Sequence, residues 1–138
     1  FFLNIKTLSQ SIEIINRKRI NDSRGWFLKP ITGTEKGLPQ FTGEIYTVYS
    51  ENGASRGGHY HKKAKEWFTL LSGTSELKLK DIRSSETMSL FLSADEPQTI
   101  VVPPYIAHRF DAIDNNSFLL LAYTNELFNS NDTIQLSF

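Results

Sequence analysis

The chain contains no cysteine, carries no net charge and has no long apolar run. Without cysteine it has neither disulfides nor thiolate metal ligands, a composition typical of cytoplasmic proteins. Its 15 basic and 15 acidic residues balance, so charge gives no reason to expect binding to nucleic acid or to an anionic membrane surface. No apolar segment approaches the ~20 residues of a membrane span, and the first residues do not resemble a secretory signal. We therefore expect a protein of the cytoplasm.

Helical periodicity is also scarce, because no stretch of about ten residues repeats apolar side chains at helical spacing. Short segments rich in β-branched and aromatic residues alternate instead with turn formers such as Asn52-Gly53, Gly57-Gly58 and Ser72-Gly73. The predicted strands are 44–50, 66–71, 75–82, 86–92, 99–102, 108–113 and 117–124. The 138 residues therefore predict one all-β domain, closed as a barrel or a sandwich.

All three histidines of the chain fall in a pattern that is typical of a metal site. His59 and His61 form an H-x-H pair, Glu66 follows, and His108 comes from a later segment. Side chains two residues apart in a strand share a face, so His59 and His61 should point the same way. We expect Glu66 beside them on the adjacent strand and His108 from across the barrel. Isolated histidines are more often surface or core residues, but three imidazoles and a carboxylate suit Zn²⁺, Fe²⁺, Mn²⁺ or Ni²⁺.

The same residues resemble the two sequence motifs of the cupins. The first motif, G-x5-H-x-H-x4-E-x6-G, is matched at every named position by Gly53, His59, His61, Glu66 and Gly73. The second, G-x5-P-x-G-x2-H-x3-N, keeps Pro103 and His108 but differs at its other named positions, which are Pro97, Tyr105 and Ala112. The resemblance implies an RmlC-like cupin double-stranded β-helix, a jelly-roll barrel with a ligand cavity inside.

A narrower resemblance covers most of the chain. Residues 22–27 (DSRGWF) and 56–60 (RGGHY) resemble the D-x-R-G-x-F and R-G-x-H-Y segments of the dTDP-4-dehydrorhamnose 3,5-epimerases. The second segment, with Tyr46 upstream, also resembles the dTDP-sugar 3,4-ketoisomerases. Residues 125–128 (NELF) are similar to the cupin epimerase domain of bifunctional capsular-polysaccharide enzymes. All three groups act on 4-keto-6-deoxy nucleotide sugars. The resemblance thus implies an epimerase or ketoisomerase that acts beside the C4 ketone of a dTDP- or UDP-linked sugar, in deoxysugar or surface-polysaccharide biosynthesis.

The resemblance also implies catalytic roles, and two of them conflict. His59 matches the base of the metal-free epimerases, and Tyr46 matches the catalytic tyrosine of the ketoisomerases. A histidine nitrogen on a metal cannot take a proton, so either His59 is the base in an empty site or it is a ligand and Tyr46 is the base. Tyr105 and Tyr123 are poorer substitutes. Leu127-Phe128 replaces the tyrosine that reprotonates the sugar in 3,5-epimerases, which argues against double epimerisation.

For substrate binding we expect Arg24 and Arg56 to hold the nucleotide diphosphate, since guanidinium groups match phosphate oxygens. Further substrate-binding candidates are Phe27, Arg83 and Tyr105. The basic run 17–19 (RKR) is interpreted as a solvated face.

Two further expectations concern partners and rival functions. The resemblance implies a homodimer to which residues 1–30 contribute, with the segment 2–15 on a partner's sheet. The same four metal ligands also fit a metal-dependent cupin dioxygenase or oxidoreductase, which would not explain Arg24 and Arg56. A third possibility is a non-catalytic sugar-binding cupin.

Overall fold

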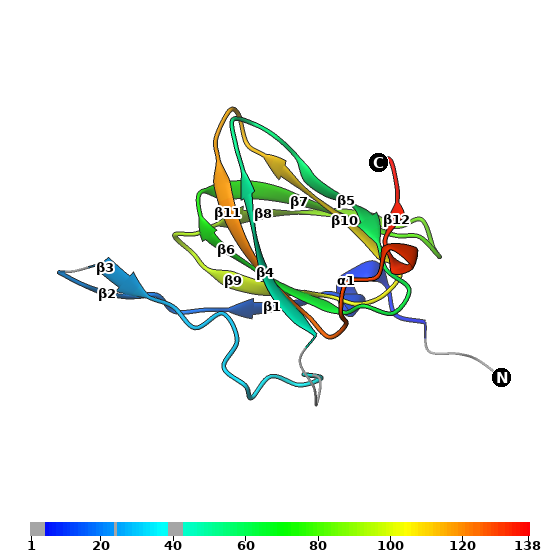
Figure 1. The fold of residues 1–138 in the computed structure, drawn as a ribbon, viewed down its shortest axis with the longest axis horizontal. Coiled ribbons are helices and arrows are strands. Elements are labelled where there is room, and N and C mark those ends of the chain that lie inside the picture. Colours follow the sequence, from blue (N-terminus) through cyan, green and yellow to red (C-terminus); the bar gives the residue numbers. More distant parts are fainter. Residues whose placement is uncertain (1–4, 24, 39–42) are drawn as a thin grey trace.

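Two antiparallel five-stranded sheets face each other in the computed structural model, which describes residues 5–23, 25–38 and 43–138, with 25–27 as backbone only (Figure 1). The first sheet has the order β1 (Glu13–Asn16), β9 (Gln98–Val102), β6 (Glu66–Ser72), β11 (Phe118–Thr124) and β4 (Glu44–Ser50). The second has the order β12 (Ile134–Gln135), β5 (Arg56–Tyr60), β10 (Ile106–Ala112), β7 (Thr74–Asp81) and β8 (Thr87–Ser93). A hairpin of β2 (Ile20–Asp22) and β3 (Gly25–Phe27), helix α1 (Leu8–Ser11) and the 3₁₀ turn η1 (Ser130–Asp132) complete the described elements.

The main core fills the space between the two sheets. In β7 every second side chain is buried, so Leu77 and Leu79 face the opposite sheet while Lys78 and Lys80 face outward. Phe68 of β6 and Phe110 of β10 meet from the two sheets with ring centroids 5.0 Å apart. Burying each such side chain stabilises the fold by about 1.5–3 kcal/mol. This packing fixes the distance between the sheets and thereby the walls of any cavity between them.

A second, smaller core lies on the outer face of the first sheet. Trp67 and Tyr123 are buried there, and the N-terminal residues Ile15, Ile31 and Leu38 pack against them. Strand β6 is consequently covered on both faces, which explains its nearly continuous apolar sequence.

The basic run 17–19 is only partly the solvated face that we expected. Arg17 is a half-buried exception: its guanidinium lies 2.8 Å from the Glu35 carboxylate and also donates to the carbonyl of Pro30. The Arg17 and Glu35 side chains are 11% and 5% exposed. The ion pair joins the segment after β1 to the loop that contains Glu35, and Arg17 also donates to the Thr99 hydroxyl of β9 at 3.1 Å.

The seven predicted strands all exist, with ends that move by no more than two residues. The turn predicted at Gly57-Gly58 is wrong, because both glycines lie inside β5, at a register shift against β10. Sequence patterns did not predict the short strands β1, β2, β3 and β12, and of β5 they predicted only the strand conformation around His59. Strand β1 overlaps the segment 2–15 that we expected on a partner's sheet and pairs with β9 of the same chain; a contribution of this segment to a dimer stays a prediction. Among the described residues, no helix has the length and apolarity needed to cross a bilayer.

Candidate metal centre and substrate cavity

The three imidazoles come from two neighbouring strands of the second sheet. His59 of β5 lies directly opposite His108 of β10 in the strand register, and His61 follows one residue after the end of β5. The pairing slips just beyond His108, where Gly57 has φ +89°. A Cβ on Gly57 would lie 2.8 Å from the carbonyl oxygen of His108. Only glycine therefore allows the two histidine strands to approach this closely.

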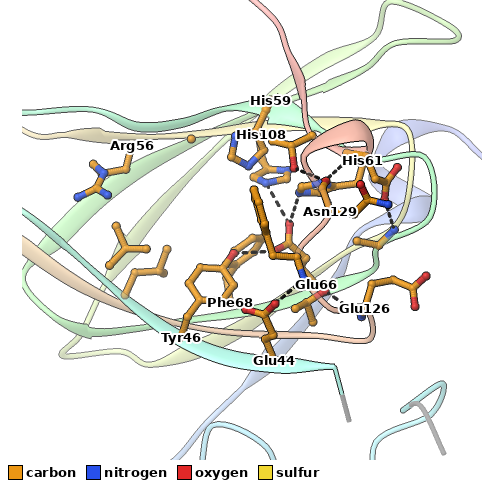
Figure 2. A pocket seen from close by; sticks show the side chains of 18 of the residues that line it. Glu44, Tyr46, Arg56, His59, His61, Glu66, Phe68, His108, Glu126 and Asn129 are labelled. Carbon is orange, nitrogen blue, oxygen red and sulfur yellow. Dashed lines mark hydrogen bonds and ion pairs between the residues drawn. The ribbon is translucent and has the colours of Figure 1, made fainter. Parts of the chain in front are cut away.

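Glu66 reaches the imidazoles from the opposite sheet (Figure 2). It is the first residue of β6, is 3% exposed, and places Oε1 3.0 Å from Nε2 of His61 and 3.2 Å from Nε2 of His108. We expected Glu66 beside His59 and His61, and His108 from across the barrel, and this expectation is wrong. Glu66 is the residue that crosses between the sheets, whereas His108 lies on the strand next to His59.

Hydrogen bonds fix the tautomers of two of the histidines. Nδ1 of His61 lies 2.6 Å from the backbone carbonyl of Asp132, and Nδ1 of His108 lies 3.2 Å from that of Ile106. A carbonyl oxygen only accepts, so both Nδ1 atoms must carry hydrogen. In the neutral rings each Nε2 then presents a lone pair to Glu66.

Three buried atoms with lone pairs therefore face one another: Nε2 of His61, Nε2 of His108 and Oε1 of Glu66 make no hydrogen bond. Their separations are those of ion pairs, but an attraction exists only if a proton or another cation lies among them. Protonating the imidazoles would satisfy the carboxylate, and a divalent metal would satisfy all three atoms at once.

The spacing and chemistry of these donor atoms fit a metal ion. One atom from each of His59, His61, Glu66 and His108 lies within 4.8 Å of the others. Ligands about 2.0–2.2 Å from one zinc ion are roughly 3.5 Å apart in a tetrahedron, so the group needs only a small contraction. Nδ1–H groups held by carbonyls are also the outer contacts that metal-binding histidines usually make.

The surroundings of His59 and Glu66 lower the pKa of each group. Burial lowers the pKa of His59 to about 4, helped by the neighbouring His108 and His61, so its imidazole is neutral at pH 7. Burial works against ionisation of Glu66, but His108 and His61, where Nε2 is protonated, lower the pKa of Glu66 far below the usual range. The cluster thus offers a neutral imidazole beside a permanent carboxylate.

Tyr46 completes this group from strand β4. Its hydroxyl donates to Oε2 of Glu66 at 2.6 Å. Burial, and after it the charge of Glu66, raises the pKa of Tyr46 well above its usual value. Tyr46 therefore keeps its proton in this environment and directs it at Glu66.

A cavity of about 460 Å³ opens beside these residues between the two sheets. Figure 2 shows Arg56 at one side of the histidine group and the carboxylates of Glu44 and Glu126 at the other. Nη1 of Arg56 donates to the carbonyl of Tyr49 at 2.6 Å, which holds this exposed side chain beside the cavity.

The structure does not bring every predicted residue to the cavity. Arg83 and Tyr105 do not line it; they contact each other, with the guanidinium 5.1 Å from the ring centroid. Tyr105 still contacts the site through its backbone, because its N–H donates to the carbonyl of His61 at 2.7 Å. Tyr123 lies on the outer face of its sheet. Arg24 and the side chain of Phe27 are outside the described residues.

Sequence reasoning missed several cavity residues near the C-terminus. Asp132 touches His61 across 71 positions of sequence through a backbone carbonyl, a contact that leaves no residue-type signal. Leu127 and Phe128, which the sequence analysis compared with the tyrosine of the 3,5-epimerases, line the cavity mouth and are 72% and 73% exposed.

A jelly roll of two facing sheets with a buried histidine–glutamate cluster defines a cupin of the RmlC-like type. Comparison with protein families gives the particular assignment. The family described as "Polysaccharide biosynthesis C-terminal domain" matches residues 20–134, and the chain belongs to this family.

Two curated relatives share about a quarter of their aligned residues with the chain. The Pseudomonas aeruginosa UDP-2-acetamido-2,6-beta-L-arabino-hexul-4-ose reductase is 23% identical over 108 residues, which are 78% of this chain and 27% of the reductase. The Bacillus subtilis spore coat polysaccharide biosynthesis protein SpsL is 24% identical over 114 residues, 79% of this chain and 75% of SpsL. The chain thus spans about a quarter of the first relative and three quarters of the second.

Solved structures agree on the fold. RmlC, a dTDP-6-deoxy-D-glucose-3,5-epimerase from Legionella pneumophila, superposes with a TM-score of 0.81 at 19% identity over 97% of this chain and 77% of that one. A 3,4-ketoisomerase from Helicobacter canadensis gives a TM-score of 0.72 at 22% identity over 90% of both chains. The capsular protein CapF from Staphylococcus aureus gives 0.65 at 22% identity, over 88% of this chain and 33% of CapF.

Proposed function

We propose that this protein is an isomerase of nucleotide sugars, an epimerase or ketoisomerase that acts beside a C4 ketone. The proposal is supported by family membership and by the names of the relatives and structural neighbours. The observation that carries it is the convergence of a neutral imidazole, a buried carboxylate and a tyrosine hydroxyl on one cavity.

Epimerisation or isomerisation beside a ketone begins with removal of a proton from the adjacent carbon. This requires a proton acceptor within about 3 Å and a group that stabilises the developing enolate oxygen. We propose that His59, His61, Glu66 and His108 hold a divalent metal, with Zn²⁺ favoured over Fe²⁺, Mn²⁺ or Ni²⁺. When bound, such an ion would act as a Lewis acid that polarises a substrate oxygen.

His59 is the residue whose role has two solutions. Unlike His61 and His108, its ring has no orienting hydrogen bond to the described part of the chain, and it is neutral at pH 7. It therefore suits a proton acceptor as well as a fourth ligand. Tyr46 keeps its proton because burial and the charge of Glu66 raise its pKa, and it suits the role of proton donor to the sugar. If His59 is a ligand, Tyr46 is the remaining group of the cluster that can exchange a proton with the sugar.

A His59→Asn variant separates these roles. If His59 is the base, the variant retains its zinc content but loses catalysed proton exchange. If His59 is a ligand, zinc and exchange are lost together. Metal content by mass spectrometry and exchange by NMR, measured on the same preparation, give the answer.

We propose that Arg56 contacts the diphosphate of a dTDP- or UDP-linked keto sugar, with Arg24 as a second contact. Arg56 is the arginine that lines the cavity among the described residues. The printed names of the relatives include both UDP- and dTDP-sugars, so both nucleotides belong in the test. Such a substrate fits a cytoplasmic protein.

Isotope exchange tests the proposal directly. The protein is incubated in D₂O with 4-keto-6-deoxy nucleotide sugars of both types, and deuterium is located by NMR. Label at C3 alone supports 3-epimerisation or 3,4-ketoisomerisation. We expect this result because Leu127 and Phe128 replace the tyrosine that reprotonates the sugar in 3,5-epimerases. No incorporation into any of these sugars, under conditions where an authentic epimerase labels them, contradicts the proposal.

We also propose a homodimer. Strand β4 is an edge of the first sheet, and its outward side chains Ile45 and Tyr49 are 64% and 53% exposed. Exposed apolar side chains along a sheet edge favour pairing with another chain. Light scattering should give about twice the chain mass of 15.8 kDa, and Ile45→Lys with Tyr49→Lys should give the monomer.

A further inference from the structure

The C-terminal segment formed by η1 and β12 lies against the strand that carries His59 (Figure 1). Strand β12 pairs with β5, placing Gln135 opposite His59, and the N–H of Leu136 donates to the carbonyl of Gly58 at 2.9 Å. Turn η1 begins at an N-cap, Asn129, whose side chain accepts the N–H of Asn131. The segment is thus hydrogen-bonded to the strand that carries His59.

Asp132, the last residue of η1, holds the loop after β5 at two points. Its backbone carbonyl accepts the Nδ1–H of His61 at 2.6 Å. Its carboxylate accepts the N–H groups of Lys62, Lys63 and Ala64 at distances from 2.7 to 3.2 Å. Three amides on one carboxylate fix the position of Asp132 relative to this loop, and hence the direction of the carbonyl that meets the imidazole.

We infer that Asp132 is a positioning residue for His61. By fixing the carbonyl, its carboxylate keeps His61 in the Nδ1–H tautomer with Nε2 directed at Glu66. The consequence for metal binding rests on the proposed function, whereas the tautomer itself does not. Outer contacts of this kind typically change metal affinity 10–100-fold when they are lost.

Two variants and a matched control test the inference. Asp132→Ala removes all the carboxylate contacts, and Asp132→Asn keeps one acceptor oxygen for the amides. The control is Asp81→Ala, because the buried carboxylate of Asp81 also accepts a loop amide, that of Arg83 at 2.9 Å, but lies outside the cavity lining. It measures what the loss of a buried turn contact costs in general.

The first readout is Zn²⁺ affinity, measured by chelator competition well below the melting temperature of each variant. We expect Asp132→Ala to bind Zn²⁺ about 10–100-fold more weakly than the parent, Asp132→Asn to lie between, and Asp81→Ala to match the parent. With Co²⁺, the visible absorption band should shift in Asp132→Ala alone. Equal affinities and spectra in the parent and Asp132→Ala would overturn the inference while leaving the proposed metal site intact.

The second readout needs no metal. Long-range ¹H–¹⁵N NMR of the chelator-treated protein at pH 9 reports histidine tautomers, with His61 assigned by its absence in His61→Gln. We expect the Nδ1–H form in the parent and a mixture in Asp132→Ala. If the parent binds no Zn²⁺ but this change occurs, the positioning role stands and the proposed metal site fails. An unchanged tautomer in Asp132→Ala contradicts the positioning role.

Discussion

Among the described residues, Glu66 carries the only negative charge that touches the imidazoles, since Oε1 lies 3.0 and 3.2 Å from two of them. Glu66→Gln keeps the size of the side chain and an oxygen for Tyr46 but removes the charge. We expect zinc content, measured by mass spectrometry after equilibration with Zn²⁺, to fall at least tenfold. The control is Glu44→Gln, which lines the same cavity without an imidazole contact. A Glu66→Gln protein that retains parental zinc would disprove the ligand assignment.

Glu35 gives a pH-dependent prediction remote from the cavity. Burial by itself would raise its pKa, but hydrogen bonds from Thr32 and Arg17 lower the pKa from 4.5 to about 2. A carboxyl whose pKa falls on folding stabilises the protein fully above its ordinary pKa, and this stabilisation is lost as the pH drops towards about 2. Losing these charge-assisted hydrogen bonds should cost about 1.5–3 kcal/mol at neutral pH.

Melting temperatures of the parent and Glu35→Gln between pH 7 and pH 2 check this prediction. The variant should melt several degrees lower at pH 7, and the gap should close below pH 4.5. Glu51→Gln, which changes an exposed carboxyl, should follow the parent throughout. A gap that stays constant with pH would show that Glu35 contributes through its shape and not through its charge.

Among the elements, the register shift between β5 and β10 is what brings His59 and His108 together. Gly57→Ala adds a Cβ 2.8 Å from the His108 carbonyl, and Gly33→Ala adds one at a similarly positive φ with nothing within 4 Å. Both variants should lose about 1–2 kcal/mol from the backbone conformation. Gly57→Ala should lose roughly 1–3 kcal/mol more through crowding, together with zinc binding. Urea denaturation and metal analysis measure these losses, and equal losses in both variants would refute the close approach.

The strands of the core were predictable because alternation with a period of two is local. The clustering of His59, His61, Glu66 and His108 was predictable because their spacing follows the cupin motif. The sheet to which each strand belongs was not predictable: β6 joins the first sheet and β5 the second, so Glu66 faces the imidazoles across the core. The contact of Asp132 with His61 was not predictable, because it depends on how the C-terminal segment folds back, which no local pattern encodes.

For the molecule as a whole, ligands that bind only the native state should raise the melting temperature. Zn²⁺ at about 100 times its dissociation constant contributes roughly 2.7 kcal/mol, or about 9 °C for a chain of this size. We expect dTDP or UDP to add a separate shift. Arg56→Gln should abolish the nucleotide shift and retain that of Zn²⁺. Stabilisation by simple carboxylic acids but by neither nucleotide would favour a different class of cupin.

Glu66 lies on one sheet and the imidazoles lie on the other, so the distances within the site depend on the gap between the two sheets. Phe68 touches the rings of both His108 and Phe110, with centroids 5.2 and 5.0 Å away, and so acts as the spacer that sets this gap. Altering the bulk of Phe68 would change the distances among the four proposed metal ligands although none of them is replaced. The proposed metal affinity would therefore depend on side chains of the hydrophobic interior as well as on those of the cavity wall.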